Sequence, residues 1–219
     1  MTPQLLLYHA HTACSRVTLT ALEQCGHPYE DRLLVMQNGE HKAPAFLAVN
    51  PDGKVPTLLV DGRPLAENGA ILLWLDETFP EAGLFPPATD AWDKAQHLSD
   101  LMWVSSGWHP YVRANKVPFL WTTGDVEPVR ARGRELLDGV VAQLEERLAD
   151  RPWWYGDQWS IIDTYLWWAY TNAEIGGYSI AAFPQVQQHR ARHEALPQLQ
   201  RALAREAAAV RARAEEESP

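Results

Sequence analysis

Hydrophobic and polar positions follow two different spacings along this chain. In the first eighty residues, short apolar runs separated by turn residues predict strands at Leu5–Tyr8 and Thr57–Val60. Apolar positions over Val17–Cys25 recur at helical spacing, and Gly26 is typical of a helix end. A second helix is expected over Asn68–Phe79. The first part of the chain therefore mixes strands with helices.

The order of these elements predicts a fold class. Tyr29–Val35 alternates weakly and indicates a further strand, while Gly39–Leu47 indicates a short helix or an irregular loop. Asp61-Gly62 is a pair that closes two-residue hairpins, so a last strand should follow it. The resulting order, βαβαββα, is that of a thioredoxin-like domain. We therefore expect an α/β domain over residues 1–80.

Beyond this domain the pattern is helical. Pro80–Pro87 is rich in proline and glycine and indicates a domain boundary, with a linker over 81–89 and an all-α domain over 90–219. Helices are expected over Asp90–Asn115 and Glu127–Ala149. Pro184 and Pro197 each suit the first turn of a further helix. From residue 201 onward we expect a solvated helix or a disordered end.

One helix start in the second part is marked by a capping sequence. Ser160 and Asp163 have the spacing of a capping box, in which each side chain satisfies a backbone N–H of the other residue. Both residues are therefore assigned a role in folding and none in chemistry.

The most informative stretch is Asn50–Asn68, which reads Asn-Pro-Asp-Gly-Lys-Val-Pro-Thr-Leu-Leu-Val-Asp-Gly-Arg-Pro-Leu-Ala-Glu-Asn. Val55-Pro56 precedes a strand, where proline suits a strand start and a cis bond becomes possible. Glu67-Asn68 opens an apolar helix, whose free N–H groups favour a carboxylate ligand. This string resembles the glutathione-binding half of the cytosolic glutathione transferases. Gly156 to Asp163 resembles the capping motif of their second domain, so the resemblance covers nearly the whole chain.

The resemblance implies which residues hold glutathione. Val55, before cis-Pro56, would pair its backbone with the cysteinyl part, and Glu67 with Asn68 would hold the γ-glutamyl end. The family usually has Ser or Thr where Asn68 stands, and Asn keeps the hydrogen-bonding capacity. A further set resembles the phi and theta patterns and would hold the glycine carboxylate: His41 and Lys42, with Lys54 in support. The alternative for this last set is a solvated charged loop.

Cys14 is the main candidate for the sulfur chemistry, with Ser15 beside it. A thiol at a helix N-terminus feels the positive end of the helix dipole, which favours the thiolate. Ala13-Cys14-Ser15 resembles the bacterial beta class at this point. The alternative is an inert, packed cysteine, with Thr12 or Tyr8 supplying a hydroxyl instead.

The choice of residue decides between two reactions. A hydroxyl that donates to the glutathione sulfur favours conjugation to electrophiles, whereas a cysteine can form and exchange a mixed disulfide. Position 17 is Val, so a Cys-x-x-Cys pair is absent, and Cys25 lies about 16 Å further along a helix. Any redox chemistry would therefore use a single thiol.

Some features depart from the beta class. Its His-Lys pair in the first long helix of the second domain is replaced by Ser105-Ser106. His11, Trp108 and Tyr111 are candidates for an apolar substrate pocket, although helix packing explains the aromatic residues equally well. His9, His11 and Cys14 offer no fourth ligand nearby, so we expect no metal.

Composition limits the partners. A formal charge of −9 argues against nucleic acid as a general partner, and no apolar run approaches the roughly 20 residues of a membrane span. Two cysteines and no basic, apolar leader suggest a reducing cytoplasm.

Taken together, the resemblance implies a glutathione transferase that acts on a small hydrophobic electrophile, takes part in detoxification and forms a homodimer. Conjugation and glutathionyl-disulfide exchange are both open. The alternatives are a glutathione-dependent isomerase of the maleylacetoacetate type, whose Ser-Cys-Ser stretch is close to Ala13-Cys14-Ser15, and a non-catalytic binding protein for glutathione or apolar ligands. A structural partner on the same fold is disfavoured by the intact Val55-Pro56 and Glu67-Asn68.

Overall fold

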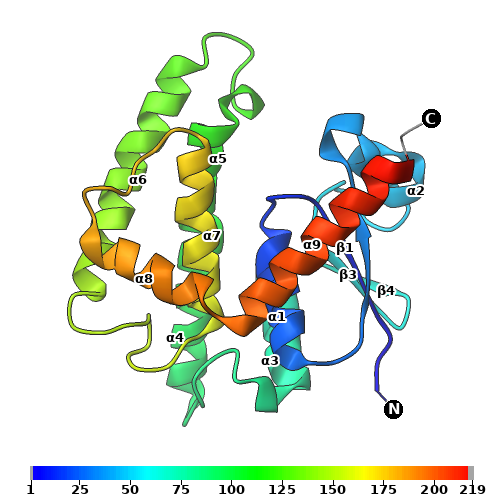
Figure 1. Cartoon of the computed structure of the whole chain (residues 1–219), viewed down its shortest axis with the longest axis horizontal. Helices are drawn as coiled ribbons and strands as arrows, with labels where there is room; N and C mark the ends of the chain where they lie inside the picture. Colours follow the sequence, from blue (N-terminus) through cyan, green and yellow to red (C-terminus); the bar gives the residue numbers. More distant parts are fainter. Residues whose placement is uncertain (1, 217–219) are drawn as a thin grey trace. The chain divides into compact units, whose positions relative to one another are not determined.

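A four-stranded sheet, in the order β2-β1-β3-β4, forms the framework of the first part of the chain (Figure 1). The computed structural model describes residues 2–216. The strands are β1 (Leu5–His9), β2 (Glu30–Leu33), β3 (Thr57–Val60) and β4 (Arg63–Ala66). Strand β1 pairs in parallel with β2 and antiparallel with β3, which pairs antiparallel with β4. The sheet thus has the mixed pairing of a thioredoxin-like domain.

The helices of this part follow the predicted order. They are α1 (Ser15–Cys25), α2 (Pro44–Leu47) and α3 (Asn68–Thr78), with the 3₁₀ turns η1 (Met36–Asn38), η2 (Glu40–Lys42) and η3 (Pro80–Ala82). Gly26 ends α1 in the left-handed conformation, at φ 65°, which glycine adopts without steric cost. The predicted α/β fold of the first part is therefore confirmed, element by element.

The described residues group into two units, and their membership differs from the division expected from the sequence. One unit runs up to Leu84 and resumes at Leu196, and the other spans Phe85–Ala195. The last helix, α9 (Pro197–Glu216), therefore packs with the thioredoxin-like unit, although its place in the sequence suggested the helical domain. Arginine side chains of α9 explain this, because they form ion pairs with carboxylates of α1 and β2.

The second unit is helical. Its elements are α4 (Ala91–Met102), the π-helical segment η4 (Trp103–Trp108), α5 (His109–Lys116), the 3₁₀ turn η5 (Pro118–Leu120), α6 (Glu127–Arg147), α7 (Ile161–Ile175) and α8 (Pro184–Glu194). The helix expected over 90–115 is one continuous run of α4, η4 and α5. No helix among residues 2–216 has the length and apolar character that crossing a membrane requires.

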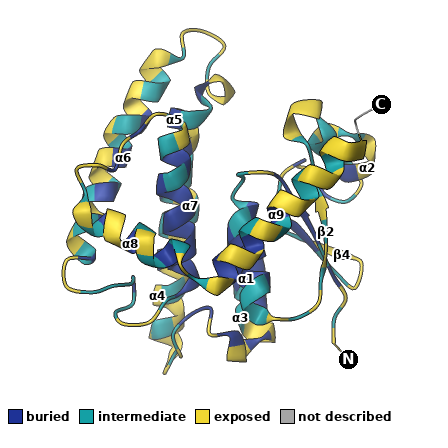
Figure 2. Cartoon of the chain, viewed as in Figure 1, coloured by how far each residue is buried: buried dark blue, intermediate teal, exposed yellow. Residues whose placement is uncertain are grey.

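Helix α7 forms the core of the helical unit and appears dark blue in Figure 2 over most of its length. Its start carries the predicted capping box: Asp163 accepts from the Ser160 N–H at 2.8 Å and from the Ser160 hydroxyl at 2.9 Å. The same carboxylate also accepts from the Trp154 N–H at 2.7 Å and lies 3.1 Å from Nε2 of His189. The folding role assigned to Ser160 and Asp163 agrees with this network.

Candidate functional site

Cys14 occupies the N-cap position of α1, where no side chain caps the helix. Its half-buried thiol donates to the carbonyl of Val55, with a distance of 3.6 Å between Sγ and the oxygen. Val55 precedes Pro56 in a cis peptide bond. The fold therefore brings together the predicted sulfur residue and the predicted backbone partner, which are far apart in the sequence.

Asn68 joins a third segment to this point. Its Nδ2 donates to the carbonyl of Cys14 at 2.8 Å, and its Oδ1 accepts from the Thr18 hydroxyl at 2.6 Å. The side chain is buried and ties the start of α3 to the start of α1. The amide is thus engaged with protein groups on both of its sides. What α3 offers a ligand here is the row of N–H groups that begins any α-helix without an intrahelical partner.

Glu67 precedes α3 in an unusual backbone conformation, with φ 68° and ψ 122°. Such a conformation costs a non-glycine residue on the order of 1–3 kcal/mol and is concentrated at functional sites. The side chain of Glu67 is exposed. The Glu67 carboxylate is therefore suited to bind the ammonium group of a ligand. A carboxylate of the same ligand could then accept from the free N–H groups at the start of α3.

Ser15 points away from the position that Cys14 occupies. It is fully buried, its hydroxyl donates to the Ala10 carbonyl at 3.3 Å, and it accepts from the Ala10 N–H at 3.2 Å. These two bonds close the turn between β1 and α1. Cys14 and Ser15 are therefore neighbours in the sequence with different surroundings, one beside Val55 and the other inside the turn.

The predicted cations lie on a separate loop. The Lys42 ammonium donates to the Asp52 carbonyl at 2.9 Å, so η2 rests on the turn that leads to Val55. A Cβ on Gly53, which has φ +60°, would come within 2.6 Å of the His41 carbonyl. Lys54 is exposed, and its own carbonyl accepts from side chains of the same turn.

His41 has a distinct electrostatic setting on this loop. Its Nδ1 is buried and has no hydrogen-bond partner. Burial, together with the nearby charge of Lys42, lowers the pKa of the His41 imidazole below its ordinary value. His41 is therefore held neutral at pH 7, and of this loop's predicted ligands only the two lysines carry a charge there.

Sequence reasoning missed one residue that contacts the turn before α1, the buried Glu206 of α9. Its carboxylate forms an ion pair with Arg16, at 2.6 Å between Nε and Oε2, and lies 2.8 Å from Nδ1 of His11. A signal for it existed: Leu199, Ala202 and Glu206 follow helical spacing and share the buried face of α9. The expectation of a solvated or disordered end after residue 201 was wrong for this face.

The two aromatic candidates lie in the helical unit and differ in exposure. Trp108 is completely buried and packs edge-to-face on Trp103, with 5.6 Å between ring centroids. Tyr111, on α5, is half-buried. Trp108 is therefore part of the core, and only Tyr111 of the two has a surface that a ligand can contact.

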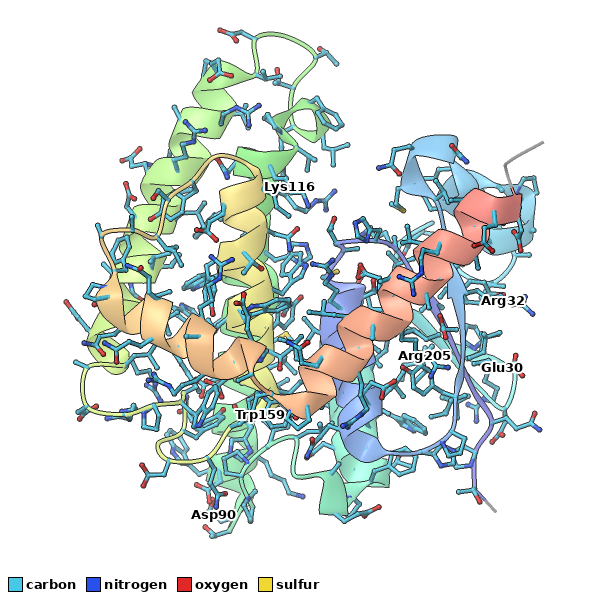
Figure 3. The ribbon with its side chains drawn as sticks, in the orientation of Figure 1. Glu30, Arg32, Asp90, Lys116, Trp159 and Arg205 are labelled. Atoms are coloured by element: carbon cyan, nitrogen blue, oxygen red, sulfur yellow. The ribbon has the colours of Figure 1, made fainter. Side chains whose placement is uncertain are left out.

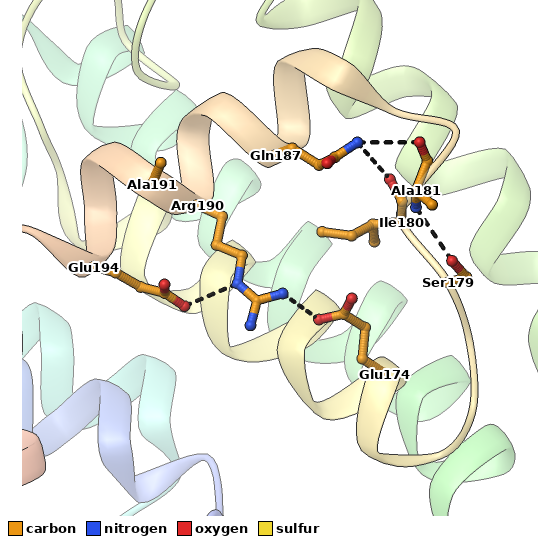
Figure 4. Close-up of a pocket in the computed structure, with 8 residues that line it drawn as sticks. All are labelled: Glu174, Ser179, Ile180, Ala181, Gln187, Arg190, Ala191 and Glu194. Atoms are coloured by element: carbon orange, nitrogen blue, oxygen red, sulfur yellow. Dashed lines mark hydrogen bonds and ion pairs between the residues drawn. The ribbon is translucent and has the colours of Figure 1, made fainter.

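The helical unit also contains a hollow of about 280 Å³ that none of the predicted site residues lines. Figure 4 shows Arg190 of α8 beside it, between Glu174 at 2.7 Å and Glu194 at 2.9 Å. Arg190 is shared between these two carboxylates, so the described residues that line the hollow offer no free cation to an anionic ligand such as glutathione. Within residues 2–216, no three His, Cys, Asp or Glu side chains gather as metal ligands would.

Comparisons with known proteins agree with this geometry. The family model of the glutathione S-transferase N-terminal domain matches residues 12–78, and that of the C-terminal domain matches residues 127–205. Maleylacetoacetate isomerase from Pseudomonas aeruginosa is 32% identical over 84% of this chain and 87% of that protein. The glutathione S-transferase GstA from Escherichia coli O157:H7 is 29% identical over 91% of this chain and 98% of that protein.

Solved structures give the same result. A glutathione transferase homologue from Sulfitobacter with bound glutathione superposes with a TM-score of 0.84 and 25% identity, covering 94% of this chain and 99% of that one. A sphingomonad glutathione S-transferase complexed with glutathione has a TM-score of 0.81 and 30% identity, covering 92% and 98%. Both neighbours extend over the thioredoxin-like and the helical parts of the chain.

Proposed function

Because the chain belongs to the glutathione transferase superfamily, we propose that it binds glutathione and transfers or exchanges groups through the thiolate of that tripeptide. The observation that carries the proposal is the meeting of Cys14, Val55 and the start of α3, joined by the Cys14–Val55 and Asn68–Cys14 hydrogen bonds. The positive end of the helix dipole at this start favours a sulfur anion, and a protonated Cys14 thiol can donate a hydrogen bond to the glutathione thiolate. This supports Cys14 as the residue that serves the glutathione sulfur.

The remaining ligand contacts follow the shape of the tripeptide. The Val55 backbone pairs with the cysteinyl unit, and Glu67 with the N–H groups that begin α3 holds the γ-glutamyl end. Lys42 and Lys54 hold the glycine carboxylate, with His41 as a neutral hydrogen-bonding neighbour. The Lys42 ammonium has three N–H donors, one of which is used by the Asp52 carbonyl.

Two predicted side chains receive supporting roles in this proposal. Asn68 fixes the two helix starts to each other through Cys14 and Thr18. Ser15 closes the turn through its two bonds to Ala10.

Two reactions are available at such a site. In disulfide exchange, the Cys14 thiolate attacks one sulfur of a glutathionyl disulfide, forms a Cys14–glutathione disulfide and releases the other thiolate. A second glutathione thiolate then attacks that mixed disulfide and restores Cys14. In conjugation, the glutathione thiolate attacks a small hydrophobic electrophile, and Cys14 only donates a hydrogen bond.

Several further properties belong to the same proposal. Tyr111 contributes to electrophile binding, and the protein works in detoxification in the cytoplasm, where Cys14 and Cys25 stay reduced. The protein is a homodimer, a proposal supported by exposed apolar side chains on α4, where Trp92 is 74% exposed.

The test replaces Cys14 and uses Cys25 as the matched control. Cys14→Ala should lower the rate of exchange with a glutathionyl disulfide by more than about 100-fold, because the attacking sulfur is gone. Cys14→Ser should abolish exchange equally but retain most conjugation of 1-chloro-2,4-dinitrobenzene, because its hydroxyl still donates. Cys25→Ala should leave both rates unchanged. Full activity of Cys14→Ala in both reactions would contradict the role of Cys14.

A second candidate is a glutathione-dependent isomerase. It is favoured by Ala13-Cys14-Ser15 and by the similarity to a maleylacetoacetate isomerase. Turnover of maleylacetoacetate with the glutathione thiol titre unchanged would support it. Absence of turnover, with consumption of thiol in the conjugation assay, would support the transferase.

A further inference from the structure

The carboxylate of Glu206, on the C-terminal helix α9, contacts the turn that leads into Cys14. Its side chain is 1% exposed. It accepts from the Thr12 N–H at 3.1 Å and from Nε of Arg16 at 2.6 Å, and Nδ1 of His11 lies 2.8 Å from Oε1. Because an ionised carboxylate only accepts, the proton in the last contact lies on the imidazole. One side chain thus holds three residues that surround Cys14 in the sequence.

The turn needs such support, because Thr12 has a left-handed backbone, with φ 59°. This conformation is unfavourable for a β-branched residue and costs on the order of 1–3 kcal/mol. In this conformation the Thr12 N–H donates to the Glu206 carboxylate. The Ser15 hydroxyl closes the same turn from inside through Ala10. Glu206 and Ser15 therefore fix its two sides.

Charge gives Glu206 a second effect at the same place. Burial by itself raises the pKa of this carboxyl, but hydrogen bonds and the charge of Arg16, with the Thr12 N–H, outweigh burial and lower the pKa. The carboxylate is therefore ionised at neutral pH and balances Arg16. Arg16 stands two positions after Cys14 in the sequence, and its positive charge is thus partly cancelled by a carboxylate of α9.

The other ion pairs of α9 contact different parts of the unit. Arg205, labelled in Figure 3, forms an ion pair with Asp31 of β2 at 2.5 Å and donates to the Tyr29 carbonyl at 2.8 Å. Arg205 therefore docks the helix without touching the turn at Thr12. It precedes Glu206 directly in the sequence, which makes it a matched control for the docking of α9.

We propose that Glu206 is a positioning residue, which holds the turn before α1 so that the Cys14 sulfur stays beside the Val55 carbonyl and the glutathione sulfur can bind there. The inference rests on the proposed function, since it names the part of α9 that shapes the same site. It makes the last helix of the chain a component of glutathione binding.

The first measurement is glutathione affinity by calorimetry on the full chain. Glu206→Ala should weaken glutathione binding by about tenfold or more, and Glu206→Gln, which keeps an acceptor for the Thr12 N–H, should weaken it less. Arg205→Ala should change the affinity less than about twofold while lowering the melting temperature. Equal weakening in Glu206→Ala and Arg205→Ala would overturn the proposal, because docking of α9 would then explain both.

The second measurement needs no glutathione. Iodoacetamide labels Cys14 at a rate that follows its thiolate fraction, and mass spectrometry of the Cys14 peptide separates it from Cys25. Loss of the negative charge in Glu206→Gln should move the pH midpoint of labelling to lower pH, whereas Arg205→Ala should not move it. If the unaltered protein binds no glutathione, the proposed function fails, and this midpoint alone decides the role of Glu206: an unmoved midpoint overturns it.

Discussion

The N-terminal ends of α1 and α7 differ in capping: side chains cap α7, whereas no side chain caps α1. At α7, Asp163 is completely buried, and its oxygens are met by Ser160, Trp154 and His189. At α1, the N-cap is Cys14, which provides no side-chain cap and keeps a half-buried thiol at the helix start. A helix start closed by its own side chains stabilises the fold, and one without a side-chain cap leaves the positive end of the helix dipole available to an anionic ligand.

The largest effect on stability should come from removing the side-chain cap of α7. Asp163→Ala removes the acceptor of four contacts in a buried site and leaves the Trp154 N–H and the Ser160 N–H without their partner. We expect a loss of about 3–5 kcal/mol in the free energy of unfolding, measured by urea denaturation. Asp157→Ala, at an exposed position nearby, is the control and should cost less than about 0.5 kcal/mol. A similar small cost for both would mean that the closed start is not a major source of stability.

The next largest effect should be a loss of stability at low pH, caused by a buried histidine that packs against α7. His109 contacts Tyr165 and Trp168 of α7, and burial, with the charge of Arg113, lowers its pKa to about 4. Below an ordinary pKa of about 6.5, the unfolded chain takes up a proton that the folded chain refuses, so stability falls as the pH drops from 6.5 toward 4. The loss at pH 4 should be roughly 3 kcal/mol for this group.

Urea denaturation between pH 7 and pH 4 measures this loss. His109→Gln, which keeps a polar side chain but has no titrating ring, should reduce the slope over that interval, and the remaining slope should come from His193, whose pKa burial and the nearby His189 also lower well below its ordinary value. Asp31 and Glu206 of the other unit have lowered pKa values in the folded state, so their contribution is present above about pH 4.5 and is lost only below it. An unchanged slope in His109→Gln would contradict the assignment of the loss to His109.

The smallest effect on stability should come from the loop that precedes Val55, the residue whose carbonyl accepts from Cys14. Gly53→Ala combines φ +60° with a Cβ 2.6 Å from the His41 carbonyl, so the loop that precedes Val55 must shift. We expect a cost of about 1–3 kcal/mol in stability together with weaker glutathione binding, measured by denaturation and calorimetry. Gly62→Ala has φ +77° and no atom within 4 Å of the added Cβ, so it separates backbone strain from the clash. Unchanged affinity in Gly53→Ala would show that this loop does not shape the site.

The sequence allowed prediction of those parts of the site that depend on local chemistry. The Val55-Pro56 pair, the helix start after Glu67 and the capping box of Ser160 each follow from residues within a few positions of one another. Such motifs can be predicted from the sequence because backbone geometry and helix capping depend on residues that are close in the sequence.

What could not be predicted depends on distant contacts. Ser15 and Cys14 look equivalent in sequence, and only the turn at Ala10 decides which of them points inward. Asn68 has the right type for a ligand contact, yet the packing of α3 on α1 engages its amide with Thr18 and Cys14. Glu206 resembles any surface glutamate of an Ala/Arg-rich helix until Arg16 is placed opposite it.

The membership of α9 has a consequence for how this protein is made. The thioredoxin-like unit contains the residues up to Leu84 but is completed only by residues from Leu196 onward, with the whole helical unit synthesised in between. At ordinary translation rates, synthesis of the helical unit takes roughly ten seconds. During that time the ion pair between Arg16 and Glu206 cannot form, because Glu206 has not yet been synthesised. On the ribosome, the helical unit is therefore complete first, and the unit that carries Cys14 reaches its final form only after the last helix has left the exit tunnel.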